Sequence, residues 1–194
     1  MAGEAALHAE ALDLQPVGAL PTGAVEAVAA RLSRHVELPV HLLPPRPLAV
    51  PRIRGRDQLD AGALLELLER LPRERPRLLV GVTGEDVAIP VFTFVFGLAR
   101  QGGEACLVSL ARTDPEFYGL PPDLERRDER AVCEVLHELG HLATLEHCQD
   151  RGCLMSFAGN IEKVDTRGSR FCPACAERLP RWLRGHPPPD LGAV

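Results

Sequence analysis

The first part of the chain alternates short apolar runs with stretches of helical periodicity. The apolar runs predict strands over residues 11–17, 36–43, 78–83, 91–97 and 105–111. Pro39 places the second of these at a sheet edge, because proline has no N–H to donate to a neighbouring strand. Helical spacing predicts one helix capped by Thr22 and another that begins at Asp60 and stops at Pro72. This alternation is typical of an α/β layer arrangement.

The pattern changes to one long helix after Asp123, its expected N-cap. Apolar residues recur along one side of this helix, at Leu124, Ala131, Val132, Val135, Leu136, Leu139 and Leu142. After His147 the periodicity disappears: residues 148–170 are predicted to be an irregular loop, 173–183 a short helix and 185–194 a Pro-rich tail. We therefore divide the chain into an N-terminal α/β subdomain, residues 1–147, and a small C-terminal subdomain, residues 148–194. So long an irregular segment needs something other than a hydrophobic core to fix it.

Composition and charge narrow the class of protein. The 194 residues are 45% hydrophobic and carry a net charge of −5, which argues against a protein built to hold a polyanion. No lysine or arginine precedes Arg31, and the most apolar window, residues 87–99, is shorter than the ~20 residues that span a bilayer. We expect a soluble, cytoplasmic monomer with no membrane or nucleic-acid partner. In a reducing compartment, the six cysteines point to metal or redox chemistry.

The long helix contains the motif His137-Glu138-Leu139-Gly140-His141. Two histidines four residues apart share a helix face, at a span that one zinc ion can bridge. Glu138 lies one residue along, so it flanks the metal rather than binding it. His147 follows six residues after His141, about 240° further round an unbroken helix. The helix must therefore end near residues 143–145 and turn back if His147 is to be the third ligand; otherwise the histidines merely lie on an amphipathic helix.

The second cluster is Cys148-x4-Cys153 followed by Cys172-x2-Cys175. Two close pairs of thiolates separated by 18 residues match a four-cysteine structural zinc site, which would organise the irregular loop. The competing interpretation of Cys172 and Cys175 is a thioredoxin-like redox pair, which leaves the first two cysteines without a role. The remaining cysteines, Cys106 and Cys133, lie in apolar runs and are expected to be core residues.

These two clusters together resemble the signature of the archaemetzincins, a family of zinc metallopeptidases in the metzincin clan. The shared motif covers residues 137–175, and weaker similarity extends over residues 78–183. The resemblance implies a zincin/metzincin-like α/β (α+β) fold, with an N-terminal mixed sheet and an irregular C-terminal subdomain holding the structural zinc. It also implies that His137, His141 and His147 bind a catalytic zinc, that Glu138 is the base and that Met155 is the Met-turn residue beneath the site. The chain would then hold two Zn²⁺ ions, one catalytic and one structural.

The chain departs from the metzincin pattern at three places. Thr144 stands where the signature has glycine. The gap between Met155 and Cys172 is one residue shorter than in the family. Phe157 occupies the position at which some other metzincins have a tyrosine that assists the oxyanion. Because the chain must leave the helix sharply, Thr144 either adopts a positive φ under strain or the turn takes another shape; we expect the first.

The resulting hypothesis is a zinc-dependent peptidase that hydrolyses peptide bonds in peptides or proteins. Glu138 would take a proton from a zinc-bound water and pass it to the leaving amine. One alternative is a zinc-binding module of the same fold that has lost catalysis, with Thr144 as the sign of the loss. Another is a nucleic-acid module that uses the cysteine ribbon and the arginines Arg52, Arg54, Arg56, Arg73, Arg75 and Arg77.

Overall fold

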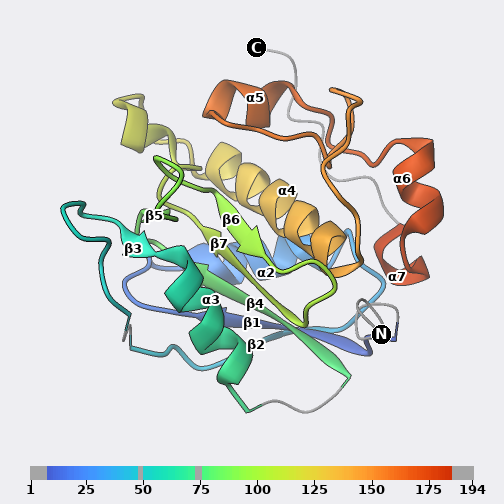
Figure 1. Ribbon diagram of the computed structural model, residues 1–194, viewed down its shortest axis with the longest axis horizontal. Helices are drawn as coiled ribbons and strands as arrows, with labels where there is room; N and C mark the ends of the chain where they lie inside the picture. The colour runs from blue at the N-terminus through green and yellow to red at the C-terminus, as the bar shows by residue number, and fades with distance from the viewer. Residues whose placement is uncertain (1–7, 48–49, 73–75, 185–194) are drawn as a thin grey trace.

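A five-stranded sheet forms the centre of the computed structural model, which describes residues 8–47, 50–72 and 76–184 (Figure 1). The strands lie in the order β2-β1-β4-β7-β6, and β6 is the one antiparallel strand of the sheet. Their bounds are β1 Ala11–Pro16, β2 Val40–Leu42, β4 Arg77–Thr83, β6 Gly97–Ala99 and β7 Ala105–Ser109. Strands β3 Leu59–Asp60 and β5 Val87–Ala88 form a separate two-stranded sheet. The predicted α/β architecture with a mixed sheet is therefore confirmed.

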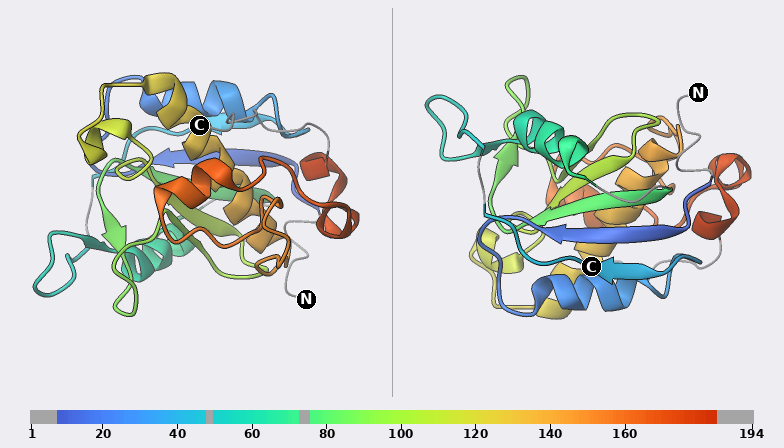
Figure 2. Two further views of the ribbon diagram at one scale, coloured as in Figure 1. Left: turned by 90° about the horizontal axis from the view of Figure 1, so that it is seen from above. Right: turned by 90° about the horizontal axis from the view of Figure 1, so that it is seen from below.

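Helices cover both faces of the main sheet (Figure 2). Helices α2 (Ala24–Leu32) and α4 (Leu124–Leu142) pack on one face, and α3 (Ala61–Arg70) packs on the other. The alternation of side chains along β4 explains how one strand serves both cores: Leu78, Val80 and Val82 join the core under α2 and α4, whereas Leu79 joins the core under α3. The chain continues through η1 (Pro115–Tyr118), α5 (Ile161–Thr166), α6 (Pro173–Arg178) and α7 (Arg181–Arg184).

Four of the five predicted strands are confirmed, and the fifth is wrong. Residues 91–96 form turns and irregular backbone, and only Gly97 belongs to a strand, β6. The composition of this segment is strand-like, yet Val91 is 81% exposed, and only the later residues pack inward: Phe96 is buried against α5, with Phe94 beside it. Pro39 does restrict the second strand, because β2 lies at the sheet edge and begins after it.

The predicted helix ends need three corrections. Helix α2 begins after Gly23, whose positive φ of 74° provides the turn, and Thr22 is not its cap. Residues 148–170 are not wholly irregular, because Asn160 caps the short helix α5 by accepting a hydrogen bond from the Lys163 amide. The predicted helix over 173–183 is two helices, since Pro180 holds Leu179 in an extended conformation between α6 and α7. Asp60 and Asp123 cap α3 and α4 as predicted.

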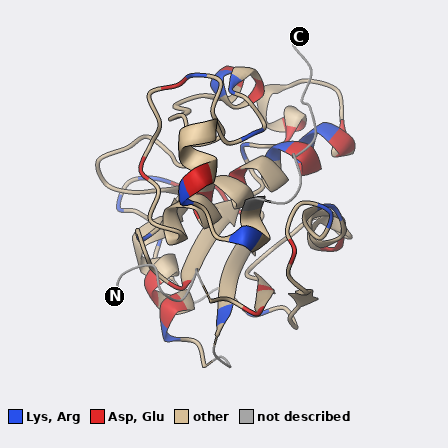
Figure 3. Ribbon diagram, turned by 90° about the vertical axis from the view of Figure 1, so that its right-hand side faces the viewer, with Lys and Arg blue, Asp and Glu red and all other residues tan. Residues whose placement is uncertain are grey.

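The charge and hydrophobicity of the helices and of the surface bear on the predicted partners. Within the described part of the chain, none of the helices combines the length and apolarity needed to cross a membrane. Lys/Arg and Asp/Glu positions are interspersed on the side of the molecule drawn in Figure 3, without one continuous stretch of positive charge. Arg73, Arg75 and the Pro-rich tail at 185–194 lie outside the described residues.

Candidate metal centres

Helix α4 brings the first two histidines together. It begins at its cap Asp123, whose carboxylate accepts a hydrogen bond from the Arg126 amide, and runs without a break to Leu142. His137 and His141 are one turn apart on the helix, and their ring centroids are 4.8 Å apart. His137 is only 5% exposed, and the site lies near the C-terminal end of α4, whose residues are largely buried from Arg127 onward.

A tight turn after α4 returns the chain so that His147 joins the pair. The Leu145 amide donates to the Gly140 carbonyl and the Thr144 amide donates to the His141 carbonyl, the two hydrogen bonds of a Schellman motif. Thr144 has a φ of 69°, as expected from its place in the signature. The His147 ring centroid lies 5.4 Å from that of His137 and 4.9 Å from that of His141.

The histidine cluster suits a metal ion in both geometry and protonation. One ligand atom from each of the three rings lies within 4.8 Å of the others. His137 and His141 each donate from Nδ1 to a backbone carbonyl, of Leu154 and Leu145 respectively, at 2.8 Å, which leaves both Nε2 atoms free. Burial lowers the pKa of all three histidines, so they favour the neutral form that binds metal.

The carboxylate of Glu138 faces a cavity of about 420 Å³ that the three histidines also line. Apolar residues form much of its wall, among them Phe92, Phe94, Phe96 and Phe157. Burial, reinforced by the nearby Glu134 carboxylate, raises the pKa of Glu138 well above its ordinary value. A buried carboxyl group with a raised pKa beside a cluster of neutral imidazoles is typical of an acid–base site.

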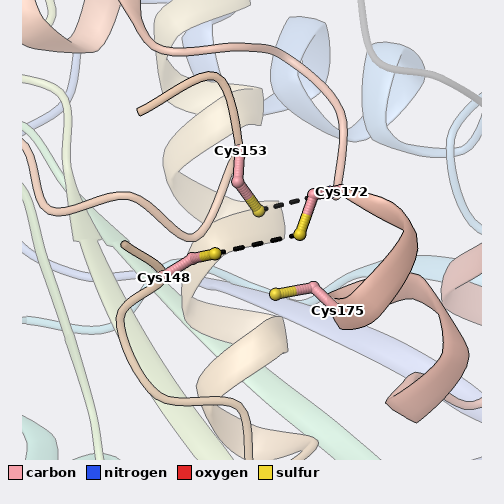
Figure 4. A group of neighbouring side chains, drawn as sticks. All are labelled: Cys148, Cys153, Cys172 and Cys175. Carbon is pink, nitrogen blue, oxygen red and sulfur yellow. Dashed lines mark hydrogen bonds between the residues drawn. The ribbon is translucent and has the colours of Figure 1, made fainter. Parts of the chain in front are cut away.

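The four cysteines predicted as a second cluster also lie together (Figure 4). Their sulfur atoms are all within 4.8 Å of one another, and the Sγ atoms of Cys148 and Cys172 are 3.8 Å apart. Cys172 and Cys175 come from the start of α6, whereas Cys148 and Cys153 come from the loop after His147. Four free thiols around one point fit a structural zinc site. A redox pair of Cys172 and Cys175 would leave Cys148 and Cys153 without a function, whereas a zinc site uses all four cysteines.

Comparison with known proteins agrees with this chemistry. The family described as Peptidase family M54 matches residues 62–181. The chain belongs to peptidase family M54. The archaemetzincin of Methanopyrus kandleri is 41% identical over 151 residues, which cover 78% of this chain and 77% of that protein. The archaemetzincin of Pyrococcus horikoshii is 39% identical over 133 residues, 68% of this chain and 71% of that protein.

Solved structures of M54-like peptidases share the fold. The crystal structure of archaemetzincin from Archaeoglobus fulgidus complexed with malonate has a TM-score of 0.74 and 30% identity, over 87% of this chain and 99% of that chain. The crystal structure of archaemetzincin from Methanopyrus kandleri has a TM-score of 0.71 and 34% identity, over 88% of this chain and 94% of that chain. The chain is thus a member of a zinc metallopeptidase family, and the resemblance to the archaemetzincins is confirmed. These matches do not favour either alternative function.

A buried ion pair that was not predicted from the sequence of this M54 chain lies beside the histidines. Arg167 donates to the Glu134 carboxylate at 2.8 Å, and both side chains are 4% exposed. The same guanidinium approaches the Nδ1 atom of His137 to 3.3 Å. Glu134 could have been found from its place one helical turn before Glu138, but nothing in the local sequence marks Arg167, which joins the site from the end of α5.

Two glycines make room for site residues. A Cβ at Gly97 would lie 2.6 Å from Oε1 of Glu138, so strand β6 can pass the carboxylate only without a side chain there. A Cβ at Gly140 would lie 2.5 Å from the sulfur of Met155, a fully buried residue that packs against α4 between the two histidine turns. Cys106 and Cys133 are buried in the core as expected and belong to neither cluster, and burial raises the pKa of Cys133 to about 12.

Proposed function

We propose that this chain is a zinc-dependent peptidase in which His137, His141 and His147 hold the catalytic zinc and Glu138 is the general base. The observation that carries the proposal is the shared cavity, into which the base and all three histidines project. Membership of the M54 family supports a peptide or protein as the substrate. Zinc, when bound, supplies a Lewis acid that acidifies water and polarises the scissile carbonyl.

The protein's own groups account for the movement of the proton. The Glu138 carboxylate takes a proton from the attacking water as the water oxygen forms its bond to the carbonyl carbon. The carboxylic acid then gives this proton to the amine nitrogen as the C–N bond breaks, and the base returns to its starting form. Burial raises the pKa of Glu138, whereas the positive charge of a bound zinc ion would favour the carboxylate form that accepts the proton.

Neighbouring groups hold the machinery in position. The carbonyls of Leu154 and Leu145 fix two of the imidazole rings, so that Nε2 rather than Nδ1 is presented to the metal. We propose that Met155 serves as the Met-turn residue, because it fills the space left by Gly140 beneath these rings. Phe157 lines the cavity but has no hydrogen-bond donor, so the oxyanion would depend on the metal and on backbone N–H groups.

We also propose that Cys148, Cys153, Cys172 and Cys175 hold a second, structural zinc that organises residues 148–194 as a subdomain. Thiolates would occupy all four positions of this ion, which leaves none for a substrate. His147 and Cys148 are adjacent, and the Cys148 amide donates a hydrogen bond to the Met155 carbonyl. A zinc ion bound to Cys148 would therefore also hold His147 in position. Free thiols are consistent with the expected cytoplasmic location, and the proposed working form is the monomer.

The test is a peptide-library cleavage screen with the wild-type protein and Glu138→Ala. We expect both proteins to bind two zinc ions by elemental analysis, and cleavage to fall by about 10²–10⁴-fold in the variant. Equal cleavage by the two proteins would refute the role of Glu138. No cleavage by a wild-type protein loaded with two zinc ions would favour the catalytically impaired module instead, and salt-sensitive binding of DNA or RNA would favour the nucleic-acid module.

A further inference from the structure

A second cavity, of about 580 Å³, adjoins the one that contains Glu138. The two cavities share three lining residues, His147, Phe157 and Arg167. The second cavity is otherwise formed by the loop after His147 and by helix α5, through Cys148, Gln149, Arg151, Ser156, Lys163 and Thr166. A ligand that extends past the histidine cluster can therefore enter it without leaving the protein surface.

The linings of the two cavities differ sharply in charge. Three carboxylates and one cation line the first cavity: Glu134, Glu138, Glu146 and Arg167. The second is lined by three cations, Arg151, Lys163 and Arg167, and by no carboxylate. The charge of Arg167 is balanced by its ion pair with Glu134. Arg151 and Lys163 are both exposed, and neither forms an ion pair with an acidic residue in the described part of the chain.

The acidic residues close in sequence to these two cations do not line the cavity. The Asp150 carboxylate accepts a hydrogen bond from the Gly152 amide within its own turn. Asp165 pairs with two arginines of α4. Glu162 is exposed and does not line the cavity. Arg151 and Lys163 can therefore form ion pairs with a negatively charged ligand in the cavity. Gln149 and Ser156 line the same cavity and can donate further hydrogen bonds to that ligand.

We propose that this second cavity is a subsite for a carboxylate group of the peptide substrate, lying beside the catalytic centre. The proposal rests on the proposed peptidase function, since it assigns the substrate class of that site. The carboxylate can belong to an acidic side chain or to the C-terminus of the peptide. In either case it binds Arg151 and Lys163 while the scissile bond lies at the histidine cluster.

The test uses internally quenched peptides in matched pairs, with Glu in place of Gln at one position at a time. Each peptide is made with a free C-terminal carboxylate and with a C-terminal amide. We expect kcat/KM to be about 3- to 10-fold higher when a carboxylate stands at one fixed distance from the cleaved bond, because each exposed cation contributes modestly. A gain for Glu identifies a side-chain carboxylate, and a gain for the free acid identifies the C-terminus.

The variant that tests the residues is the double substitution Arg151→Gln and Lys163→Gln. Both side chains are exposed, so the change leaves the core intact, and we expect the preference for a carboxylate to be lost. Arg54→Gln removes one exposed positive charge from the loop before β3 and should keep the preference. Raising the ionic strength should weaken the preference of the wild-type protein.

Binding measurements separate this proposal from the peptidase function. Fluorescence polarisation of the same peptides with zinc-loaded Glu138→Gln should show the carboxylate preference without turnover. A preference in binding with no cleavage by the wild-type protein would support the subsite and refute the peptidase function. Equal binding and equal cleavage of the paired peptides, failure of all peptides to bind, or a preference that survives the double substitution would overturn the subsite.

Discussion

Thr144 provides the sharpest test of how the turn after α4 works. It is the only non-glycine residue with a positive φ in the part of the chain that the structure describes. It occupies the position after the helix C-cap in a Schellman motif, where glycine is favoured because a Cβ clashes with the neighbouring carbonyl. Thr144→Gly should therefore stabilise the zinc-loaded protein without weakening zinc binding.

The expected gain is the difference between two opposing contributions. Removing the Cβ from a left-handed residue relieves about 1–2 kcal/mol of strain. Glycine makes the unfolded chain more flexible, which costs about 0.4–1 kcal/mol. The two hydrogen bonds of the turn use the Thr144 amide and the Leu145 amide, so the substitution preserves them. A net gain of about 0.5–1 kcal/mol corresponds to a rise in Tm of about 1–4 °C for a chain of this size.

Calorimetry of zinc-loaded protein gives Tm, and elemental analysis of the same sample gives the zinc content. Ala143→Gly is the matched control, because Ala143 has an ordinary φ of −80° and gains nothing from glycine. In Ala143→Gly the free energy of unfolding should fall by about 0.5–1 kcal/mol. If Thr144→Gly lowered Tm as the control does, the threonine would be unstrained in solution and the turn would differ from the one described.

Three further predictions concern the groups around the two clusters. Gly97→Ala should lower kcat by about 10²-fold at unchanged zinc content, because its methyl group would displace the Glu138 carboxylate; unchanged kcat would contradict this. Asp165→Asn should lower the free energy of unfolding by about 2–4 kcal/mol, since it leaves Arg130 buried without its charged partner. Despite partial burial, hydrogen bonds from arginines lower the pKa of Asp165. The stability that this carboxylate contributes is therefore present above its unfolded pKa of about 3.8 and is lost as the pH falls through its folded pKa. Denaturant titrations at several pH values should show the free energies of unfolding of the variant and the wild type converging over that range. Cys175→Ala should release one zinc ion and weaken binding of the other, and zinc retention by the histidines at wild-type affinity would refute the coupling.

Much of the fold and both clusters could be predicted because they depend on the spacing of residues that are close together in the sequence. A spacing of four on a helix places His137 and His141 on one face whatever surrounds them. The need to return His147 to the same point then requires a sharp turn, and the signature position of Thr144 locates it. Continuous apolar runs likewise mark β4 and β7, since both faces of these strands are buried.

The errors and omissions have the opposite origin, in contacts between distant segments. The 91–96 segment has the composition of a strand, but strand β7 pairs only from Gly97 onward, and the aromatic side chains before it line the cavity instead. Arg167 meets Glu134 only because α5 lies over α4, a packing that no spacing in the sequence encodes. The role of Gly97 likewise depends on how closely strand β6 passes the carboxylate of Glu138.

The order of the ligands along the chain has a consequence for biosynthesis. All five strands of the main sheet precede His137, so a growing polypeptide presents the whole sheet before its first histidine ligand. The three histidines lie within the end of α4 and the turn after it, so bringing them together costs little loop entropy. Cys172 and Cys175 are synthesised later, and joining them to Cys148 and Cys153 closes a longer loop. We therefore expect the histidine cluster to form as α4 packs on the sheet, and the cysteine cluster to form after it.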